Sequence, residues 1–196
     1  MLQTRAAVDR WSHLTASAPV IARRRAAGFV FPVLGALMLP LALSIGEPLH
    51  AQDLGIAVGA TAPSAPIETL DGKTVELSSI TGGKPTLLEF WATWCGNCKQ
   101  LEPAMLAAHK KYGTRMQFIA VAVSLNQSME RVKTYRDRFK SPFLYLYDRR
   151  GDVSEVFDAP ATSYVVILDK NGKVSYTGVG GTQNLDAAIA KALTVK

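Results

Sequence analysis

Two cysteines separated by two residues carry the most distinctive chemistry of this 196-residue chain. Cys95 and Cys98 are its only cysteines, and the surrounding segment, residues 89–99, reads EFWATWCGNCK. A pair at this spacing can close a small disulfide reversibly. If it lies at the start of a helix, the backbone N–H groups stabilise the thiolate of the outer cysteine. The pattern therefore favours a redox-active thiol pair.

Two other uses of the pair fit the sequence less well. A purely structural disulfide across so short a loop contributes only about 2 kcal/mol in the chain-entropy model. A zinc site needs two further ligands, and the chain offers only three histidines, at positions 13, 50 and 109. His109 lies eleven residues after Cys98, which is about 16 Å along a helix and too far for both to bind one metal ion. We therefore expect no metal and no other cofactor.

The elements that must position the pair can be predicted from the hydrophobic pattern. Thr86–Ala92 is apolar except for Glu89, which is typical of a strand buried on both faces, and a helix over Cys95–Tyr112 follows it. Asp71-Gly72 lies between two short runs, Ile67–Leu70 and Thr74–Leu77, and predicts that these form a β-hairpin near the start of the domain. Further predicted elements are strands at Met116–Ser124, Phe143–Tyr147, Tyr164–Asp169 and Lys173–Thr177, a helix capped by Ser128, and helices at Val153–Phe157 and Asn184–Leu193. This order predicts an α/β fold with a mixed central sheet and helices on both faces.

Several motifs make the sequence from Gly59 to the C-terminus similar to the TlpA/ResA/CcmG group of thioredoxin-like proteins. These motifs are Gly59-x-x-Ala62-Pro63, Leu70-Asp71-Gly72-Lys73, the run Phe90–Cys95, and Glu102-Pro103 after the second cysteine. The resemblance implies a thioredoxin-like fold with an added N-terminal β-hairpin. It also implies a protein that works outside the cytoplasm and usually reduces disulfides.

Glu89 gains a possible role from this resemblance, because the family places a buried acid at this position, beneath the cysteines. A carboxyl group in an apolar strand has a raised pKa, so Glu89 could shuttle the proton of Cys98 near neutral pH. The alternative is a Glu89 that faces solvent on an edge strand, since alternation alone does not place it.

The cysteines are expected to have different roles. Cys95, expected to be exposed at the start of its helix, should attack a substrate disulfide, and the shielded Cys98 should resolve the mixed disulfide. Trp94 borders Cys95 and should give partners an apolar contact, while Trp91 should lie in the core. The two intervening residues include no proline, so the reduction potential stays open.

The family's cis-proline, which faces the cysteines, has no counterpart at the expected position. In the family this proline lies six residues after an aromatic residue and six residues before the Asp of the terminal hairpin. Counting forward from Phe157 and back from Asp169 both give Ser163, which Thr162 precedes. The nearby Pro160 lies three residues earlier. A cis bond before serine costs about 2.5–4 kcal/mol, so we expect either a trans loop or a shift that brings Pro160 into the role. Thr162 and Ser163 are the candidate substrate-binding residues of this loop.

An export leader is the second strong signal. Arg23-Arg24-Arg25 precede an uncharged, mostly apolar run over residues 26–45, and Ala51 offers a cleavage site. The run is long enough to span a bilayer, although Pro32 and Pro40 would disturb a permanent helix. We expect residues 1–51 to act as a cleaved signal or a retained anchor, which would place the protein in the periplasm or at the extracytoplasmic face of the membrane. Residues 52–66 should form a linker with little structure, and residues 67–196 the domain.

Composition limits the possible functions. The net charge of +6 is small, and half of it falls in the leader, so a nucleic-acid partner is not expected. The leading hypothesis is an extracytoplasmic thiol-disulfide oxidoreductase, a monomer that reduces protein disulfides such as those of apocytochrome c or of copper-site assembly factors. A membrane thiol transporter would supply its electrons. The alternatives are a copper(I)-binding chaperone module and a peroxiredoxin-like peroxide reductase.

Overall fold

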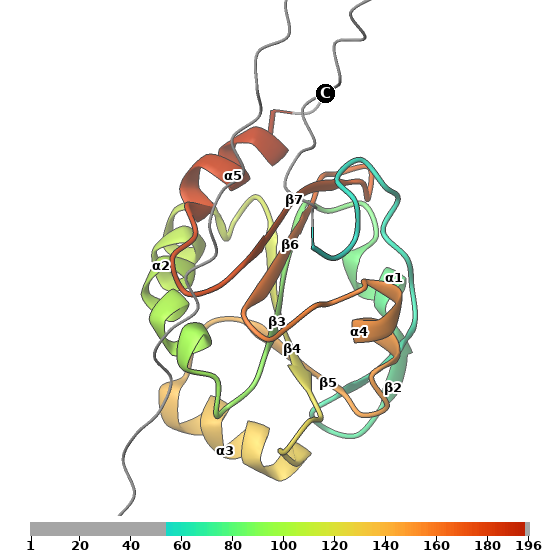
Figure 1. Cartoon of the computed structure of the whole chain (residues 1–196), viewed down its shortest axis with the longest axis vertical. Helices are drawn as coiled ribbons and strands as arrows, with labels where there is room; N and C mark the ends of the chain where they lie inside the picture. Colours follow the sequence, from blue (N-terminus) through green and yellow to red (C-terminus); the bar gives the residue numbers. More distant parts are fainter. Residues whose placement is uncertain (1–53, 195–196) are drawn as a thin grey trace, which may run out of the picture. The chain divides into compact units, whose positions relative to one another are not determined.

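The computed structural model describes residues 54–194, and these form a seven-stranded mixed sheet with helices on both faces (Figure 1). The strand order is β2-β1-β5-β4-β3-β6-β7. The strands are β1 (Pro66–Thr69), β2 (Thr74–Glu76), β3 (Thr86–Trp91), β4 (Gln117–Val123), β5 (Leu144–Asp148), β6 (Tyr164–Leu168) and β7 (Val174–Val179). The helices are α1 (Leu77–Thr81), α2 (Gly96–Tyr112), α3 (Met129–Phe139), α4 (Asp152–Val156) and α5 (Leu185–Ala192). The predicted mixed sheet is confirmed.

Strand β3 lies near the middle of the sheet, between β4, which is parallel to it, and β6, which is antiparallel. All of its residues are buried, as its apolar sequence predicts. Because side chains alternate along a strand, Leu88 and Phe90 pack in the core on one face and Leu87 on the other. Glu89 is therefore on the same face as Leu87 and Trp91.

The helices divide between the two faces of the sheet. Leu101 of α2 and Ile189 of α5 share a hydrophobic cluster with Leu87, so these two helices cover the face that Glu89 shares. Helix α3 joins the same face through Val132, which packs in a cluster with both cysteines. Helices α1 and α4 cover the opposite face, and Figure 1 shows them on the other side of the sheet from α2 and α5.

The first two strands pair antiparallel, with Ile67 opposite Val75, and β1 joins the rest of the sheet through β5. Gly72 occupies the turn with φ +91°, a conformation that glycine adopts without steric cost. The second strand ends before Leu77, which was expected to belong to it. Leu77 begins the short helix α1 instead and is buried in the core, a helix that the hydrophobic pattern does not predict.

Residues 54–65 contain turns and one isolated bridge, from Thr61 to Lys173, but no helix or strand, in line with the expectation of little regular structure; backbone hydrogen bonds nevertheless hold them against the sheet. The Ile56 N–H donates to the Tyr164 hydroxyl at 3.0 Å, and the Gly59 N–H donates to the Val174 carbonyl at 2.7 Å. These bonds satisfy backbone groups that a free linker would leave to water. The expected leader and membrane anchor lie outside the described residues. Within residues 54–194, no helix combines the length and apolar character needed to cross a bilayer.

Candidate active site

Cys95 and Cys98 form a disulfide at the N-terminus of α2, as their spacing predicts. Cys95 is the N-cap residue of the helix, and its Cα lies 5.3 Å from that of Cys98. The Cys98 N–H donates to the Cys95 sulfur at 3.0 Å. Because this N–H and the positive end of the helix dipole both point at Cys95, they would stabilise a thiolate there.

Both cysteines are buried in this disulfide form: 4% of Cys95 and 6% of Cys98 is exposed. The expectation that Cys95 is exposed is therefore wrong for this state. Its sulfur turns inward to Cys98 and contacts the helix N-terminus, while the neighbouring Trp94 and Gly96 remain exposed. A partner that reaches the sulfur must contact these neighbours first.

The loop that carries Trp94 is fastened to the segment after β4. The Trp94 indole N–H donates to the Leu125 carbonyl at 2.8 Å, and the Thr93 N–H donates to the Gln127 side chain at 2.9 Å. Gln127 is itself buried, and its backbone carbonyl accepts a hydrogen bond from the Tyr147 hydroxyl at 2.9 Å. We did not predict this role for Gln127. The available signal was that parallel strands β3 and β4 end at the same edge of the sheet, which brings the loops that follow them together.

Glu89 is buried on the α2 face, with 6% of the residue exposed, so the alternative of a solvent-facing edge position is wrong. It shares a cavity of about 20 Å³ with Cys98 and Glu102. Burial, and secondly the charge of Glu102, raises the pKa of Glu89 to about 8. One of its oxygens, Oε1, has no hydrogen-bond partner among the described residues. With this pKa the carboxyl group is mostly protonated at neutral pH, and a minority of it is ionised.

Glu102 is a second acid at this site, and it was predicted only as part of a family motif, without a chemical role. It accepts hydrogen bonds from the Tyr135 hydroxyl at 3.3 Å and the Ser141 hydroxyl at 3.0 Å. Burial, followed by the charge of Glu102, raises the pKa of Tyr135. Glu102 follows Cys98 by four residues, about one helical turn, and this spacing could have revealed that both residues lie on the same side of α2.

The loop before β6 is held together by Ser163, which is fully buried with φ +63°. Its N–H donates to the Phe90 carbonyl at 2.7 Å, and its hydroxyl donates to the Gly180 carbonyl at 3.0 Å. No peptide bond within residues 54–194 is cis, so the trans alternative describes this loop. Because Ser163 is enclosed, its side chain offers no surface to a substrate, and the expectation of substrate contact there is corrected. Thr162 is partly exposed.

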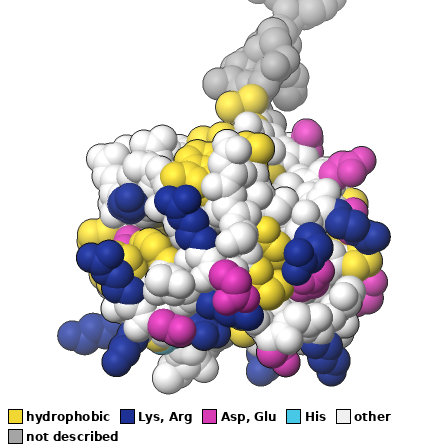
Figure 2. Space-filling view, turned by 90° about the horizontal axis from the view of Figure 1, so that it is seen from below, with side chains coloured by type: hydrophobic (Ala, Val, Ile, Leu, Met, Phe, Trp, Pro, Cys, Tyr) yellow, Lys and Arg dark blue, Asp and Glu magenta, His cyan; other side chains and the backbone are white. Residues whose placement is uncertain are grey.

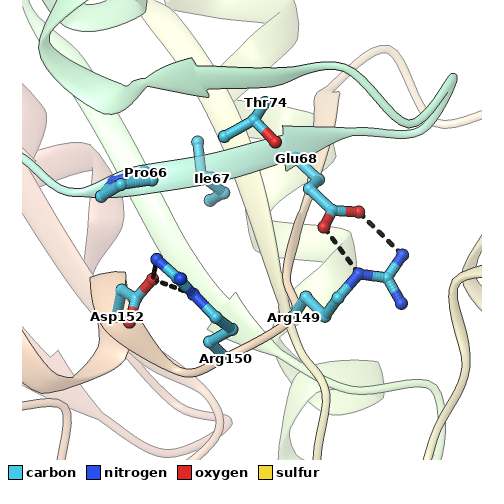
Figure 3. A pocket seen from close by; sticks show the side chains of 7 residues that line it. All are labelled: Pro66, Ile67, Glu68, Thr74, Arg149, Arg150 and Asp152. Atoms are coloured by element: carbon cyan, nitrogen blue, oxygen red, sulfur yellow. Dashed lines mark hydrogen bonds and ion pairs between the residues drawn. The ribbon is translucent and has the colours of Figure 1, made fainter.

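A further concave region of about 290 Å³ lies beside β1 and contains no cysteine. Figure 3 shows its charged side chains engaged with one another: Arg149 donates two hydrogen bonds to Glu68, and Arg150 contacts Asp152 at 2.6 Å. Because each charge already has a partner, this region is accounted for by ion pairs at the sheet edge.

Comparison with known proteins supports the chemistry of the cysteine pair. The family model described as Redoxin matches residues 57–193. Thioredoxin-like protein YneN of Bacillus subtilis is 32% identical over 130 residues, which cover 66% of this chain and 75% of that protein. Thiol-disulfide oxidoreductase ResA of Geobacillus thermodenitrificans is 29% identical over 142 residues, covering 70% of this chain and 80% of ResA.

A solved structure gives the same result at the level of the fold. A Chlorobium tepidum protein assigned as the thiol:disulfide interchange protein DsbE superposes with a TM-score of 0.62 at 27% identity, covering 70% of this chain and 98% of that one. The mixed sheet is thus thioredoxin-like, as the sequence resemblance implied. With its disulfide at a helix N-terminus, the chain belongs to the Redoxin family and is a thiol-disulfide oxidoreductase of the thioredoxin superfamily.

Proposed function

We propose that this protein is an extracytoplasmic reductant of protein disulfides. The observation that supports the proposal most is the shared cavity of Cys98 and Glu89, beside a cysteine pair at the N-terminus of α2. One strand and the helix that follows it thereby supply both a stabilised thiolate and an acid with a pKa of about 8. Disulfide exchange requires the thiolate, and the acid can assist it by exchanging the proton of Cys98.

The reaction proceeds through two exchanges. In the reduced protein, the Cys95 thiolate attacks one sulfur of a substrate disulfide; that S–S bond breaks, a mixed disulfide forms, and one substrate thiolate leaves. The Cys98 thiolate then attacks the Cys95 sulfur, which forms the internal disulfide and releases the second substrate thiolate. Two electrons pass from the pair to the substrate, and a membrane thiol donor must return them.

Glu89 handles the proton of Cys98 in both directions. During substrate reduction, the ionised carboxylate accepts the Cys98 proton before the second exchange. When the donor reduces the internal disulfide, Cys98 leaves as a thiolate and the protonated carboxyl group returns the proton. The pKa of about 8 lies close to the value of about 8.5 for a free thiol, so neither transfer is strongly uphill. Glu102 acts as a positioning residue, since its charge helps to keep this pKa high.

The substrate contacts the protein around the rim of the buried disulfide. Trp94, with 41% of the residue exposed, and the exposed Leu125 form an apolar surface beside it. Thr162 precedes β6, whose first residue pairs with the end of β3, so Thr162 lies at the same end of the sheet as the disulfide. We assign substrate contact to Trp94 and Thr162, while Ser163 fixes the loop from inside.

The extracytoplasmic location and the substrates follow from the leader and the family. Arg23-Arg24-Arg25 and the apolar run over residues 26–45 are typical of export or anchoring. Oxidising compartments form disulfides, so proteins that need free thiols there require a dedicated reductant. The proposed substrates are apocytochrome c and copper-site assembly factors.

The reduction potential of the Cys95–Cys98 couple tests the direction of electron flow. A value near about −270 mV fits a reductant, and a value near about −120 mV would show an oxidant and contradict the proposal. A second test replaces Cys98 with serine, which should trap substrates on Cys95 as mixed disulfides. The matched Cys95→Ser variant should trap none, and trapping by both variants alike would contradict the assigned order.

A further inference from the structure

A groove of about 240 Å³ lies between helix α3 and the segment that carries the cysteine pair, and residues on both sides of that pair in the sequence line it. Thr93 and Lys99, which flank the cysteine pair in the sequence, line one side of it, and Arg131 and Arg138 of α3 line the other. Figure 2 views the molecule from below, which is the α3 side in Figure 1, and shows basic side chains on this face with hydrophobic surface and some acidic side chains between them.

The groove is positively charged. Lys99, Arg131 and Arg138 are all exposed, and none of the three forms an ion pair with another residue of the 54–194 range. No acidic side chain lines the groove. The other two cations within α3 do have acidic partners; the pairs are Lys133–Glu130 and Arg136–Asp137. The unpaired charges of the helix therefore gather on the side that lines the groove.

The wall of the groove also holds a polar group without a partner. Only 9% of Thr93 is exposed, and its hydroxyl has no hydrogen-bond partner among the described residues. A buried hydroxyl without a partner costs free energy, so this one favours a ligand that accepts its hydrogen bond. On the opposite side, the exposed ring of Phe139 packs 4.4 Å from that of Tyr135 and supplies apolar surface.

We propose that this groove binds an acidic segment of the substrate protein, next to the disulfide that is reduced. The inference rests on the proposed function and adds the chemical class of the substrate surface. Carboxylates of the segment would face Lys99, Arg131 and Arg138, and the apolar parts of the segment would lie against Phe139. Because Thr93 is two residues from Cys95, a segment in the groove holds its neighbouring cysteine close to the nucleophile.

Three disulfide peptides that differ only in the residues flanking one cysteine test this proposal. The flanking residues are glutamate, glutamine or lysine, and the readout is the second-order rate constant for oxidation of the reduced full-length protein. At low salt we expect the glutamate peptide to react fastest and the lysine peptide slowest, with a spread of about tenfold. At about 1 M salt the Debye length falls to about 3 Å, so the spread should collapse.

A matched pair of variants locates the effect. Arg131→Gln/Arg138→Gln removes the groove charges of α3 and leaves Lys99, so it should lower the rate with the glutamate peptide most of the way to that with the glutamine peptide. Lys133→Gln/Arg136→Gln removes the same total charge from the same helix, outside the groove, and should preserve the preference. An equal loss in both double variants would show an effect of net charge and overturn the proposal.

The remaining outcomes separate this proposal from the proposed function. Equal rates for all three peptides would overturn the groove and leave the reductase intact, whereas no reduction of any peptide would contradict the reductase. In that case a binding measurement still tests the groove. The glutamate peptide with serine in place of cysteine should bind the disulfide form of the protein. The groove variant, Arg131→Gln/Arg138→Gln, should lose this binding. If the groove variant instead loses binding to phosphatidylglycerol vesicles while peptide preference is unchanged, the face binds membrane and the proposal fails.

Discussion

Glu89 combines burial with a nearby negative charge, and a single substitution tests what this does to stability. In the folded protein its pKa is raised to about 8 from the ordinary value of 4.5. The unfolded chain ionises first as the pH rises, so the folded state loses relative stability between these two values and the loss is complete above the upper one. Glu89→Gln removes this loss.

We expect Glu89→Gln to leave stability nearly unchanged at pH 4 and to raise it by up to about 3 kcal/mol at pH 7. Urea unfolding at both pH values measures the difference. Glu68→Gln is a control of opposite sense, because the hydrogen bonds from Arg149 lower the pKa of Glu68 and its stabilisation is lost as the pH falls. A gain for Glu89→Gln that does not change with pH would contradict the raised pKa.

The same variant tests the proton relay. If Glu89 transfers the Cys98 proton, Glu89→Gln should slow disulfide exchange by about 10² and flatten its dependence between pH 6 and 9, while the fold stays intact. Stopped-flow exchange with a peptide disulfide gives the profile, and the pKa of Cys98 follows from alkylation rates. An unchanged profile and an unchanged Cys98 pKa would make Glu89 a bystander.

At the scale of elements, Gln127 connects the redox loop to the segment between β4 and α3. Gln127→Leu would leave the Thr93 N–H without its acceptor, and we expect a loss of about 1–3 kcal/mol in unfolding free energy together with greater mobility of Trp94. Leu125→Ala is the control: the exposed side chain is shortened while the carbonyl that accepts from Trp94 stays, so stability should change by less than about 0.5 kcal/mol. Equal losses in both variants would contradict the role of Gln127.

The elements follow from the sequence wherever the hydrophobic pattern is strong. The predicted strand at Thr86–Ala92 and the helix after Cys95 match β3 and α2 within a residue, because burial on both faces and the helix N-cap leave clear local signals. Three features had no such signal. The order of residues 54–66 comes from hydrogen bonds to distant strands, the burial of Cys95 from its bond to Cys98, and the role of Gln127 from two loops that meet only in the fold.

For the candidate site, sequence reasoning supplied the residues, but the structure was needed for their relations. The cysteine spacing predicted the disulfide, and the family resemblance together with the apolar run around Glu89 favoured its burial. That Glu102 and Tyr135 share a cavity with Glu89 depends on α2 and α3 covering the same face of the sheet, which depends on tertiary packing.

At the scale of the whole molecule, the proposed location can be tested with the full chain. If residues 1–51 direct export, a C-terminal alkaline phosphatase fusion should be active, because that reporter needs an oxidising compartment to form its disulfides. A fusion that starts at residue 54 lacks this segment and should be inactive. A second full-length fusion carries a reporter that is active only in the cytoplasm. If this fusion is active and the alkaline phosphatase fusion is not, the extracytoplasmic proposal is contradicted.

Ser163 joins three parts of the molecule, and this has a consequence for how the chain can evolve. Its N–H bonds to β3, its hydroxyl bonds to Gly180, and its carbonyl accepts from the side chain of Gln183. Proline has no N–H, and its ring holds φ near −65°, far from the +63° found here. A mutation to the proline typical of the family would thus lose two hydrogen bonds and misfit the backbone at once. Relatives on this lineage are expected to keep a small polar residue or glycine here, since a return to proline requires several coordinated changes.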